Sequence, residues 1–323
     1  MARILVTRIT FPDFIQELER RFEVEHNAED RPWPKEELVR RLQGKQGVLS
    51  TVMDRFDESV IAAAPDLKAI SNIAVGFNNI DVAAATKRGI RVTNTPGVLN
   101  ETTADFTWAT LMAAARRVAE ADAHVRAGRW KIAFGTEYFL GADVHHATLG
   151  MIGIGRIGQA IARRAAGFDM RVLYHDPQRL AAEDEKRLNA TWVERDRLLA
   201  ESDFVVVMVP YSKETHHFIG AADFAKMKKS AIFVHTARGG VVDDAALVEA
   251  LKSGRIAGAG VDVFEGEPAL DSGYLGLRNV VLTPHIASAS HATRLAMCRL
   301  AAENMAEALE GRRPPNLVNT ELA

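Results

Sequence analysis

Short apolar runs alternate with amphipathic helical patterns along the first hundred residues. Runs rich in β-branched residues occur at 2–7, 47–51, 67–76 and 91–96, and helical patterns lie between them at 34–44, 58–65 and 81–89. This alternation is typical of a parallel sheet covered by helices. Several runs are almost entirely apolar, as expected for strands buried on both faces of a sheet. The pattern predicts an α/β domain.

A second alternating series occupies the rest of the chain. It begins with a long helical segment at 100–128, and apolar runs then recur with helices between them at 147–155, 170–176, 203–210, 229–238, 258–264 and 279–286. These are the units of a doubly wound nucleotide-binding sheet. We assign the helical stretch 289–311 to the first domain. The sequence thus predicts an α/β protein with two doubly wound parallel sheets: residues 1–99 and 287–323 form one domain, and 100–286 form a Rossmann domain.

Composition narrows the functional classes. Forty Lys and Arg residues nearly balance 42 Asp and Glu residues among 323, without a basic block, so we expect no nucleic-acid partner. No window approaches the roughly 18 uninterrupted apolar residues of a membrane span, so we expect no membrane partner. The single cysteine, Cys298, cannot form an internal disulfide and fits a reducing compartment. We therefore expect a cytoplasmic protein.

A glycine-rich turn lies between the first strand and first helix of the second series. In MIGIGRIGQAIA, Gly153, Gly155 and Gly158 have the spacing G-x-G-x-x-G. Such a turn lets the backbone approach a pyrophosphate, and the following helix N-terminus favours its negative charge. Arg156 and Ile157 are expected at the phosphates. The motif predicts a dinucleotide-binding site.

An acidic residue ends the next strand. Asp176, in MRVLYHDP, lies near the offset at which a carboxylate binds ribose hydroxyls and repels a 2′-phosphate. NAD is therefore favoured, although the nearby Arg179 leaves NADP open.

Three polar residues follow strands of the second domain. Arg238 offers a planar fork for a carboxylate, His285 can transfer a proton near neutral pH, and Glu267 can orient an imidazole. Taken singly, each has a structural alternative: a surface cation, a buried ring or a turn carboxylate. Together they predict a carboxylate anchor beside an acid/base group.

Two histidine pairs suggest a metal site only superficially. Neighbouring residues on a strand point to opposite faces, and neither His145–His146 nor His216–His217 has a third ligand at a helical offset, so we predict no metal. Aromatic residues also gather before the second series. We interpret them as packing between domains or subunits in preference to substrate contact: Trp130, Phe134, Tyr138 and Phe139.

The motifs VGFNNIDV, LGMIGIGRIGQAIA, VHTARGGVVDDAAL, VDVFEGEP and LTPHIASAS resemble, in order and spacing, those of the D-isomer-specific 2-hydroxyacid dehydrogenases. The resemblance runs from about residue 45 to 319. GADVHHATLGMIGIGRIG, LLAESDF and FAKMKKSAIF are similar to the glyoxylate/hydroxypyruvate and 2-ketogluconate reductase branch.

The resemblance implies a substrate-binding domain at 1–99 and 287–323, an NAD(P)-binding domain at 100–286, and a homodimer. Arg238 would bind the 2-oxo acid, His285 would donate the proton, and Glu267 would pair with His285. Backbone N–H groups around Val75 and Gly76 would complete the carboxylate site. Further positions would line the cofactor: Thr103, Val209, Pro210, Thr215, Thr236, Ala237 and Asp262, with Arg238 and His285.

The sequence departs from the pattern in two ways. The branch often has a basic residue after the second strand and uses NADPH, where this chain has Asp176 and Pro177. His235 stands where asparagine is common, and we interpret it as structural because alternation points it away from Thr236.

The main hypothesis is a nicotinamide-dependent oxidoreductase that reduces small 2-oxo acids such as glyoxylate, hydroxypyruvate or 2-ketogluconate to D-2-hydroxy acids. The alternative is a dinucleotide-sensing binding protein resembling the corepressors that share this fold. The chain shows no basic segment or docking extension that favours the alternative. Phosphoglycerate and formate are weaker substrate candidates.

Overall fold

The computed structural model describes residues 1–8, 10–29, 31–132 and 135–323, so Phe134 of the aromatic stretch lies outside the described residues. The chain divides into two compact units, Met1–Leu99 with Ala289–Ala323, and Asn100–Ser288. The second crossing point lies two residues beyond the expected one. The N–H groups of Ile286 and Ala287 each donate to the Asp262 carboxylate at 2.9 Å, which keeps this segment in the second unit.

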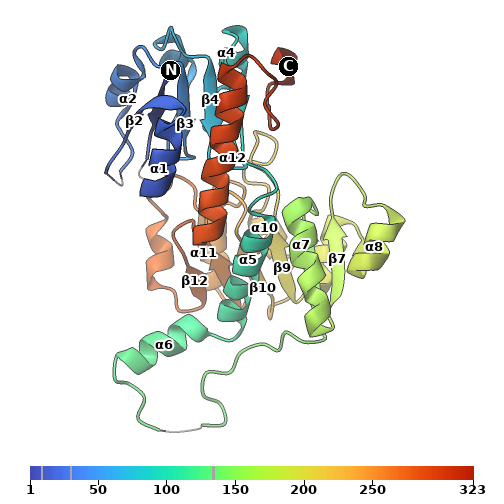
Figure 1. The fold of residues 1–323 in the computed structure, drawn as a ribbon. Coiled ribbons are helices and arrows are strands. Elements are labelled where there is room, and N and C mark those ends of the chain that lie inside the picture. The colour runs from blue at the N-terminus through green and yellow to red at the C-terminus, as the bar shows by residue number, and fades with distance from the viewer. Residues whose placement is uncertain (9, 30, 133–134) are drawn as a thin grey trace. The chain divides into compact units, whose positions relative to one another are not determined.

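The first unit is built on a five-stranded parallel sheet of order β2-β1-β3-β4-β5 (Figure 1). Its strands are β1 (Ala2–Val6), β2 (Phe22–His26), β3 (Gly47–Ser50), β4 (Ala69–Asn72) and β5 (Arg91–Thr93). Its helices are α1 (Pro12–Glu19), α2 (Lys35–Leu42), α3 (Glu58–Ala62), α4 (Val82–Lys87) and α12 (His291–Leu309), with a 3₁₀ turn at Thr320–Leu322. The expected doubly wound sheet is confirmed.

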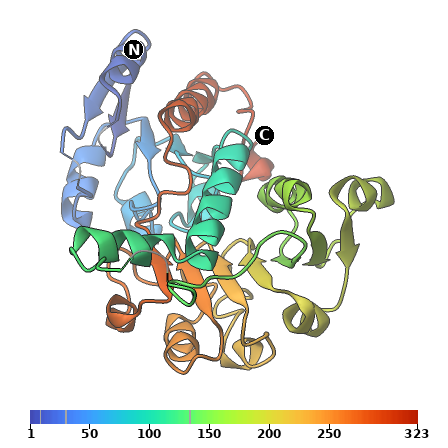
Figure 2. The same ribbon diagram turned by 90° about the horizontal axis from the view of Figure 1, so that it is seen from below.

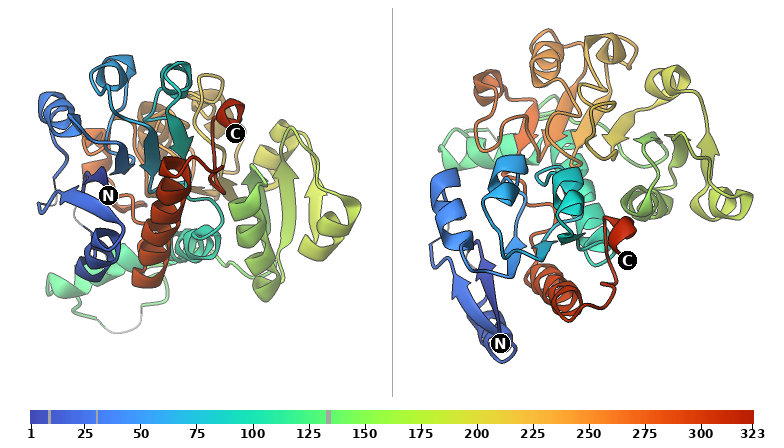
Figure 3. Two further views of the ribbon diagram at one scale, coloured as in Figure 1. Left: turned by 45° about the horizontal axis from the view of Figure 1, so that its top comes forward. Right: turned by 90° about the horizontal axis from the view of Figure 1, so that it is seen from above.

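Helices cover both faces of this sheet (Figure 3). On β1, Leu5 packs with residues of α2, α3 and α4, whereas Ile4 packs with α1 and α12. A residue added to β1 would exchange these faces, because successive strand side chains point to opposite sides. The C-terminal helix α12 therefore supplies part of the first unit's core, including Met305.

The second unit contains a seven-stranded parallel sheet of order β12-β11-β10-β9-β6-β7-β8. Its strands are β6 (Thr148–Ile152), β7 (Arg171–His175), β8 (Ala190–Trp192), β9 (Phe204–Val207), β10 (Ile232–His235), β11 (Gly258–Val261) and β12 (Val280–Leu282). Its helices are α5 (Asn100–Ala115), α6 (Val118–Arg126), α7 (Arg156–Ala165), α8 (Ala182–Leu188), α9 (Arg195–Glu201), α10 (Ala221–Phe224) and α11 (Asp244–Lys252), with 3₁₀ turns at Ala166–Phe168 and Ser272–Gly276. The strand order reverses between β9 and β6, and the loops after the strands gather at one sheet edge.

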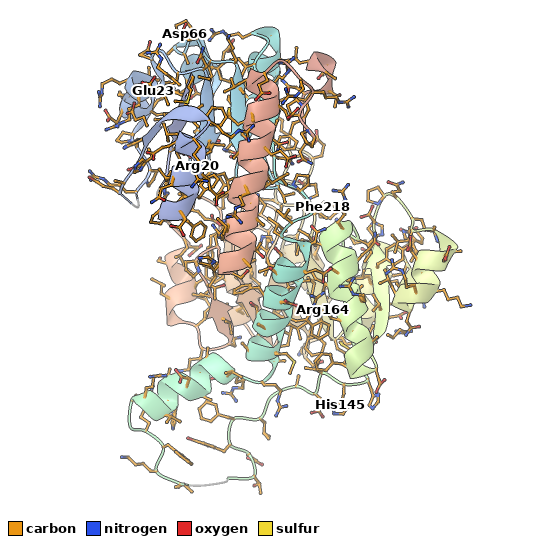
Figure 4. The ribbon with its side chains drawn as sticks, viewed as in Figure 1. Arg20, Glu23, Asp66, His145, Arg164 and Phe218 are labelled. Atoms are coloured by element: carbon orange, nitrogen blue, oxygen red, sulfur yellow. The ribbon has the colours of Figure 1, made fainter. Side chains whose placement is uncertain are left out.

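Helices cover both faces of this second sheet (Figure 2), and an apolar core forms on each face. Phe204 and Val206 of β9 face α5 and α7, while Val205 faces α9, α10 and α11. Full burial of such side chains stabilises each by roughly 1.5–3 kcal/mol. Arg164 of α7, which is labelled in Figure 4, also pairs with Asp105 of α5 at 2.6 Å.

The predicted long helix at 100–128 is in fact two helices, α5 and α6. Arg117 between them has a φ of +54°, and the Ala115 carbonyl accepts a hydrogen bond from Ala142 at 2.9 Å instead of continuing the helix. No residue of α6 is buried. Across the described ranges, no helix is long and apolar enough to cross a membrane.

Candidate functional site

The glycine-rich turn joins β6 to α7 beside the reversal in strand order. Gly153 has a φ of +91°, and a Cβ atom there would lie 2.5 Å from the Met208 carbonyl oxygen. A Cβ atom on Gly158 would lie 2.5 Å from the carbonyl oxygen of Gly153. These two positions therefore require glycine, one for conformation and contact, the other for close packing of helix against turn.

Gly155 differs because a Cβ atom there would meet no heavy atom within 4 Å. It immediately precedes α7, whose first residues are Arg156 and Ile157, and contributes no side-chain cap. The open space and the uncapped N–H groups of α7 suit a pyrophosphate, which needs close backbone approach and a helix N-terminus. The residues present thus fit a dinucleotide.

Asp176 follows β7 and faces the glycine turn. Its Oδ2 accepts a hydrogen bond from Ile154 N at 3.0 Å, and its Oδ1 accepts one from Gln178 N at 2.9 Å. The nearby Arg179 forms an ion pair with Glu185, with Nε and Oε1 2.9 Å apart, and Glu185 also accepts a hydrogen bond from Tyr174. The hydrogen bond from Arg179 lowers the pKa of Glu185. The carboxylate at position 176 is held in place, and Arg179 already has a partner.

Arg238, His285 and Glu267 form one chain of side-chain contacts at the carboxyl edge of the sheet. Arg238 Nη1 lies 3.1 Å from His285 Nε2, and His285 Nδ1 lies 2.7 Å from Glu267 Oε2. They follow three neighbouring strands, β10, β12 and β11. Arg238 and His285 are 47 positions apart in the sequence, and Glu267 and His285 are 18 apart, so the structure brings together three distant residues.

Burial and charge act differently on the ends of this chain. Burial lowers the pKa of the Arg238 guanidinium, and the negative charge of Glu267 opposes that effect. Burial would raise the pKa of Glu267, but the hydrogen bond and charge of His285 outweigh it, so this pKa is lowered. An arginine stays charged even when its pKa falls. The three contacting side chains therefore present a cation, an imidazole and a carboxylate side by side.

Asp262, at the end of β11, fixes the turn that carries His285. Its side chain is fully buried and accepts hydrogen bonds from Thr283 Oγ1 at 2.7 Å and from Ile286 N and Ala287 N. Its backbone carbonyl accepts from His285 N at 2.8 Å. These bonds hold His285 at a φ of +54°, a conformation that few non-glycine residues adopt. The carboxylate of Asp262 therefore positions the histidine.

The other expected cofactor-lining residues lie near the same edge. Thr236 Oγ1 bonds with Thr107 of α5 at 2.7 Å, and Thr215 Oγ1 donates to the Pro210 carbonyl at 2.7 Å. Thr103 lies on α5, Val209 follows β9, and Ala237 lies between Thr236 and Arg238.

In the first unit, Val75 and Gly76 follow β4. Their carbonyl oxygens accept hydrogen bonds at 2.8 Å from the side-chain amides of Asn94 and Asn72, respectively. Two asparagines thus fix the backbone at the expected carboxylate-binding peptides.

His235 ends β10 on the face opposite Thr236. Thr236 points to α5, whereas Phe233, which shares a face with His235, packs in the core on the other side. The ring of His235 is 1% exposed, and within the described residues neither nitrogen has a hydrogen-bond partner of standard geometry. Burial lowers the pKa of His235 to about 4.

Sequence reasoning missed one grouping. It placed His216 and His217 on opposite faces, but the structure stacks their rings at 3.9 Å, because the chain there turns at His217, where φ is +50°, and is not extended. Glu265 lies beside them, 48 residues along the chain from His217. No local spacing signals a neighbour so distant in sequence.

Taken together, the doubly wound sheet, the glycine turn and the arginine-histidine-glutamate chain define a dinucleotide-binding enzyme. The sequence model of the D-isomer specific 2-hydroxyacid dehydrogenase NAD-binding domain matches residues 108–287. Glyoxylate reductase from Korarchaeum cryptofilum is 51% identical over 99% of this chain and 96% of its own length. That from Thermococcus kodakarensis is 47% identical over 99% of this chain and 97% of its own.

A solved structure is also similar. The NADPH-dependent glyoxylate/hydroxypyruvate reductase of Sinorhizobium meliloti, in complex with NADP and malonate, is 32% identical, with a TM-score of 0.87 over 98% of this chain and 97% of that one. The chain belongs to the D-isomer specific 2-hydroxyacid dehydrogenase family. It is an NAD(P)-dependent oxidoreductase, and these relatives lend no support to a binding protein without turnover.

Proposed function

We propose that the protein reduces glyoxylate, hydroxypyruvate and similar small 2-oxo acids to D-2-hydroxy acids, with 2-ketogluconate as a further candidate. The observation that carries this proposal is the contact chain from Arg238 through His285 to Glu267, on the sheet edge that also carries the glycine turn. An anion anchor next to a proton donor suits a substrate with a carboxylate beside a carbonyl group.

In the proposed reaction, Arg238 holds the substrate carboxylate through its guanidinium fork. The bound cofactor supplies the hydride that C2 of the 2-oxo acid receives. His285 Nε2 gives its proton to the carbonyl oxygen as negative charge develops there, so a C–H and an O–H bond form while the carbonyl π bond breaks. Glu267 accepts a hydrogen bond from Nδ1, which fixes the ring and balances its positive charge.

The 3.1 Å contact between Arg238 Nη1 and His285 Nε2 adds a coupling between substrate binding and protonation. Arginine can only donate, so this contact requires an unprotonated Nε2. Once Nε2 carries the catalytic proton, Arg238 loses this acceptor and its Nη1 is free for the substrate carboxylate. The carboxylate in turn offsets the repulsion between the two cations. We propose that proton and substrate are taken up together.

We propose NAD as the preferred cofactor and NADP as the alternative. The held carboxylate of Asp176 suits the ribose hydroxyls and disfavours a 2′-phosphate, and the Arg179–Glu185 ion pair restrains the cation that would bind one. The S. meliloti relative is NADPH-dependent, so a similar protein uses the other cofactor.

The remaining expected contacts are proposed on their positions. Backbone N–H groups of Val75 and Gly76 would donate to the substrate carboxylate. Cofactor contacts are proposed at the glycine turn and at the surrounding loop positions: Thr103, Arg156, Ile157, Val209, Pro210, Thr215, Thr236, Ala237 and Asp262. We also propose a cytoplasmic location, on the basis of the single, buried thiol of Cys298.

We further propose a homodimer whose interface includes α6 and the segment after it. This region exposes large apolar side chains, which is unusual for a free surface: Val118, Val125, Trp130, Ile132, Tyr138 and Leu140. Replacing Trp130 and Ile132 by Glu should convert a dimer to monomers in sedimentation velocity. Leu275→Glu, at another exposed apolar residue of the same unit, should not. A monomeric wild-type protein at micromolar concentration would contradict the proposal.

The activity is tested by a substrate panel. Purified protein is mixed with glyoxylate, hydroxypyruvate, pyruvate or 2-ketogluconate and with NADH or NADPH, and the loss of nicotinamide absorbance is followed. We expect turnover of glyoxylate or hydroxypyruvate and a higher kcat/KM with NADH. No turnover with any of these pairs would refute the proposed function, and an NADPH preference would refute the proposed cofactor choice alone.

A further inference from the structure

The second unit carries a compact group of His216, His217 and Glu265 on its surface. The two histidines come from the connection between β9 and α10, and Glu265 comes from the turn after β11. The imidazole rings stack with centroids 3.9 Å apart, and His217 Nε2 lies 2.7 Å from Glu265 Oε2. One ligand atom from each of the three side chains lies within 4.8 Å of the other two.

Backbone and neighbouring side chains determine this arrangement. His217 has a φ of +50°, and its N–H donates to the Gly240 carbonyl at 2.8 Å. Tyr211 Oη lies 3.4 Å from His216 Nδ1, which engages that nitrogen and leaves Nε2 for an ion. The N–H of Glu265 donates to the Asp244 carboxylate at 2.9 Å. Each of the three residues is therefore tied to the fold through a contact that leaves a ligand atom for use.

We propose that His216, His217 and Glu265 bind one zinc-class divalent ion, with water completing the coordination. Two imidazoles and a carboxylate are a known ligand set for Zn²⁺. Ligands at 2.0–2.1 Å in a tetrahedral site lie about 3.4 Å from one another. The 2.7 Å contact and the separations within 4.8 Å lie on either side of that value. Rotations of these exposed side chains that move the ligand atoms by about an ångström would therefore bring them to an ion. The contact of Tyr211 with His216 is the kind of outer partner that orients a ligating ring.

The ion would join two segments that approach the catalytic chain. His217 is bonded to Gly240, two residues after Arg238, and Glu265 lies two residues before Glu267. Phe264 N donates to Glu267 Oε1 at 2.8 Å within the same turn. An ion that binds the folded protein but not the unfolded chain should therefore stabilise this edge of the second unit. The proposed site is independent of the proposed reaction, since none of its three ligands is assigned to substrate or cofactor.

The test uses tag-free, full-length protein that has been stripped with EDTA and dialysed. Zn²⁺ binding is measured by competition with a chromophoric chelator, and Co²⁺ is added separately to read ligand number and geometry from its visible absorption. We expect one ion per chain with micromolar or tighter affinity. Saturating Zn²⁺ should raise the unfolding midpoint of the wild-type protein by about 5 °C.

Three variants remove one ligand each, and the chain supplies a matched control. H216A, H217A and E265Q should each weaken Zn²⁺ binding at least tenfold and abolish the rise in unfolding midpoint. H145A/H146A removes the other exposed histidine pair, whose ring centroids are 5.1 Å apart in an edge-on arrangement, and should bind as the wild type does. The side chain of His145 lies on the surface of the same unit (Figure 4).

Two results would overturn the proposal. One is a wild-type protein that takes up no stoichiometric Zn²⁺ at micromolar concentration. The other is binding that survives in H217A and E265Q, or that H145A/H146A weakens equally. Circular dichroism of each apo variant identifies any misfolded protein, and H217N, which suits the positive φ, then replaces H217A.

Discussion

The buried imidazole of His235 should make the free energy of unfolding depend on pH, and a single substitution at this position can measure its contribution. Its ring is 1% exposed, and burial lowers its pKa from an ordinary 6.5 to about 4. The backbone of Arg238 and the charge of Glu267 favour the protonated ring, and the charge of His285 disfavours it. We expect His235→Asn, which puts a side chain that does not titrate in this range at the same position, to remove this dependence.

The sign and size follow from linkage. Between pH 6.5 and about 4 the unfolded chain binds a proton at His235 that the folded chain does not bind. The free energy of unfolding therefore falls as the pH falls, by up to 1.4 kcal/mol per pH unit. From pH 7 to pH 5 this single ring should cost about 2 kcal/mol.

Urea unfolding followed by circular dichroism at pH 7, 6 and 5 measures the effect. The wild type should lose about 2 kcal/mol more than H235N over this interval. His26→Asn is the control, since His26 is exposed and an exposed ring is solvated in both states. Wild-type and H235N curves that fall in parallel would refute the reasoning, because they would show that the folded protein also protonates position 235.

Three further predictions concern the site. Arg238→Lys should lower kcat/KM for glyoxylate about 100-fold while changing the NADH dissociation constant less than threefold, because a point charge replaces a fork; equal kinetics would remove its assigned role. Gly153→Ala should raise the NADH dissociation constant at least tenfold in fluorescence titrations and cost about 1–2 kcal/mol in unfolding, since it combines a backbone clash with a positive φ. Glu185→Gln should free Arg179 and raise the NADPH/NADH ratio of kcat/KM severalfold, and more so with Asp176→Ser; an unchanged ratio in both would place selectivity elsewhere.

The apolar strands could be predicted because strands that are buried on both faces of a sheet consist almost entirely of apolar residues. FVVV in β9 and IFVH in β10 are such runs. Two of the edge strands, β2 and β8, are not apolar throughout. β2 reads FEVEH and β8 reads ATW, each with exposed or partly exposed residues, so neither stands out in the sequence. The break between α5 and α6 has no local glycine or proline and depends on the distant Ala142.

The candidate site shows the same division. Strand ends and the glycine spacing placed Arg238, Glu267 and His285 at one edge, because parallel strands bring their carboxyl ends together. The sequence could not show that the Asp262 carboxylate accepts hydrogen bonds from the His285 turn or that Arg179 is paired with Glu185. These are side-chain choices among several partners of similar chemistry, and only the folded arrangement selects one.

The position of α12 has a consequence for the order of folding during synthesis. The second unit is inserted within the first, between Leu99 and Ala289. One face of the first sheet is covered by α1 and α12, and the part that α12 supplies, including Ala301 and Met305, comes only from the last part of the chain. The inserted unit can therefore complete its cores while the first is still missing a helix. A ribosome that stops before α12 would release a finished nucleotide-binding unit joined to a partly uncovered apolar sheet, which is the kind of surface that aggregates or recruits chaperones.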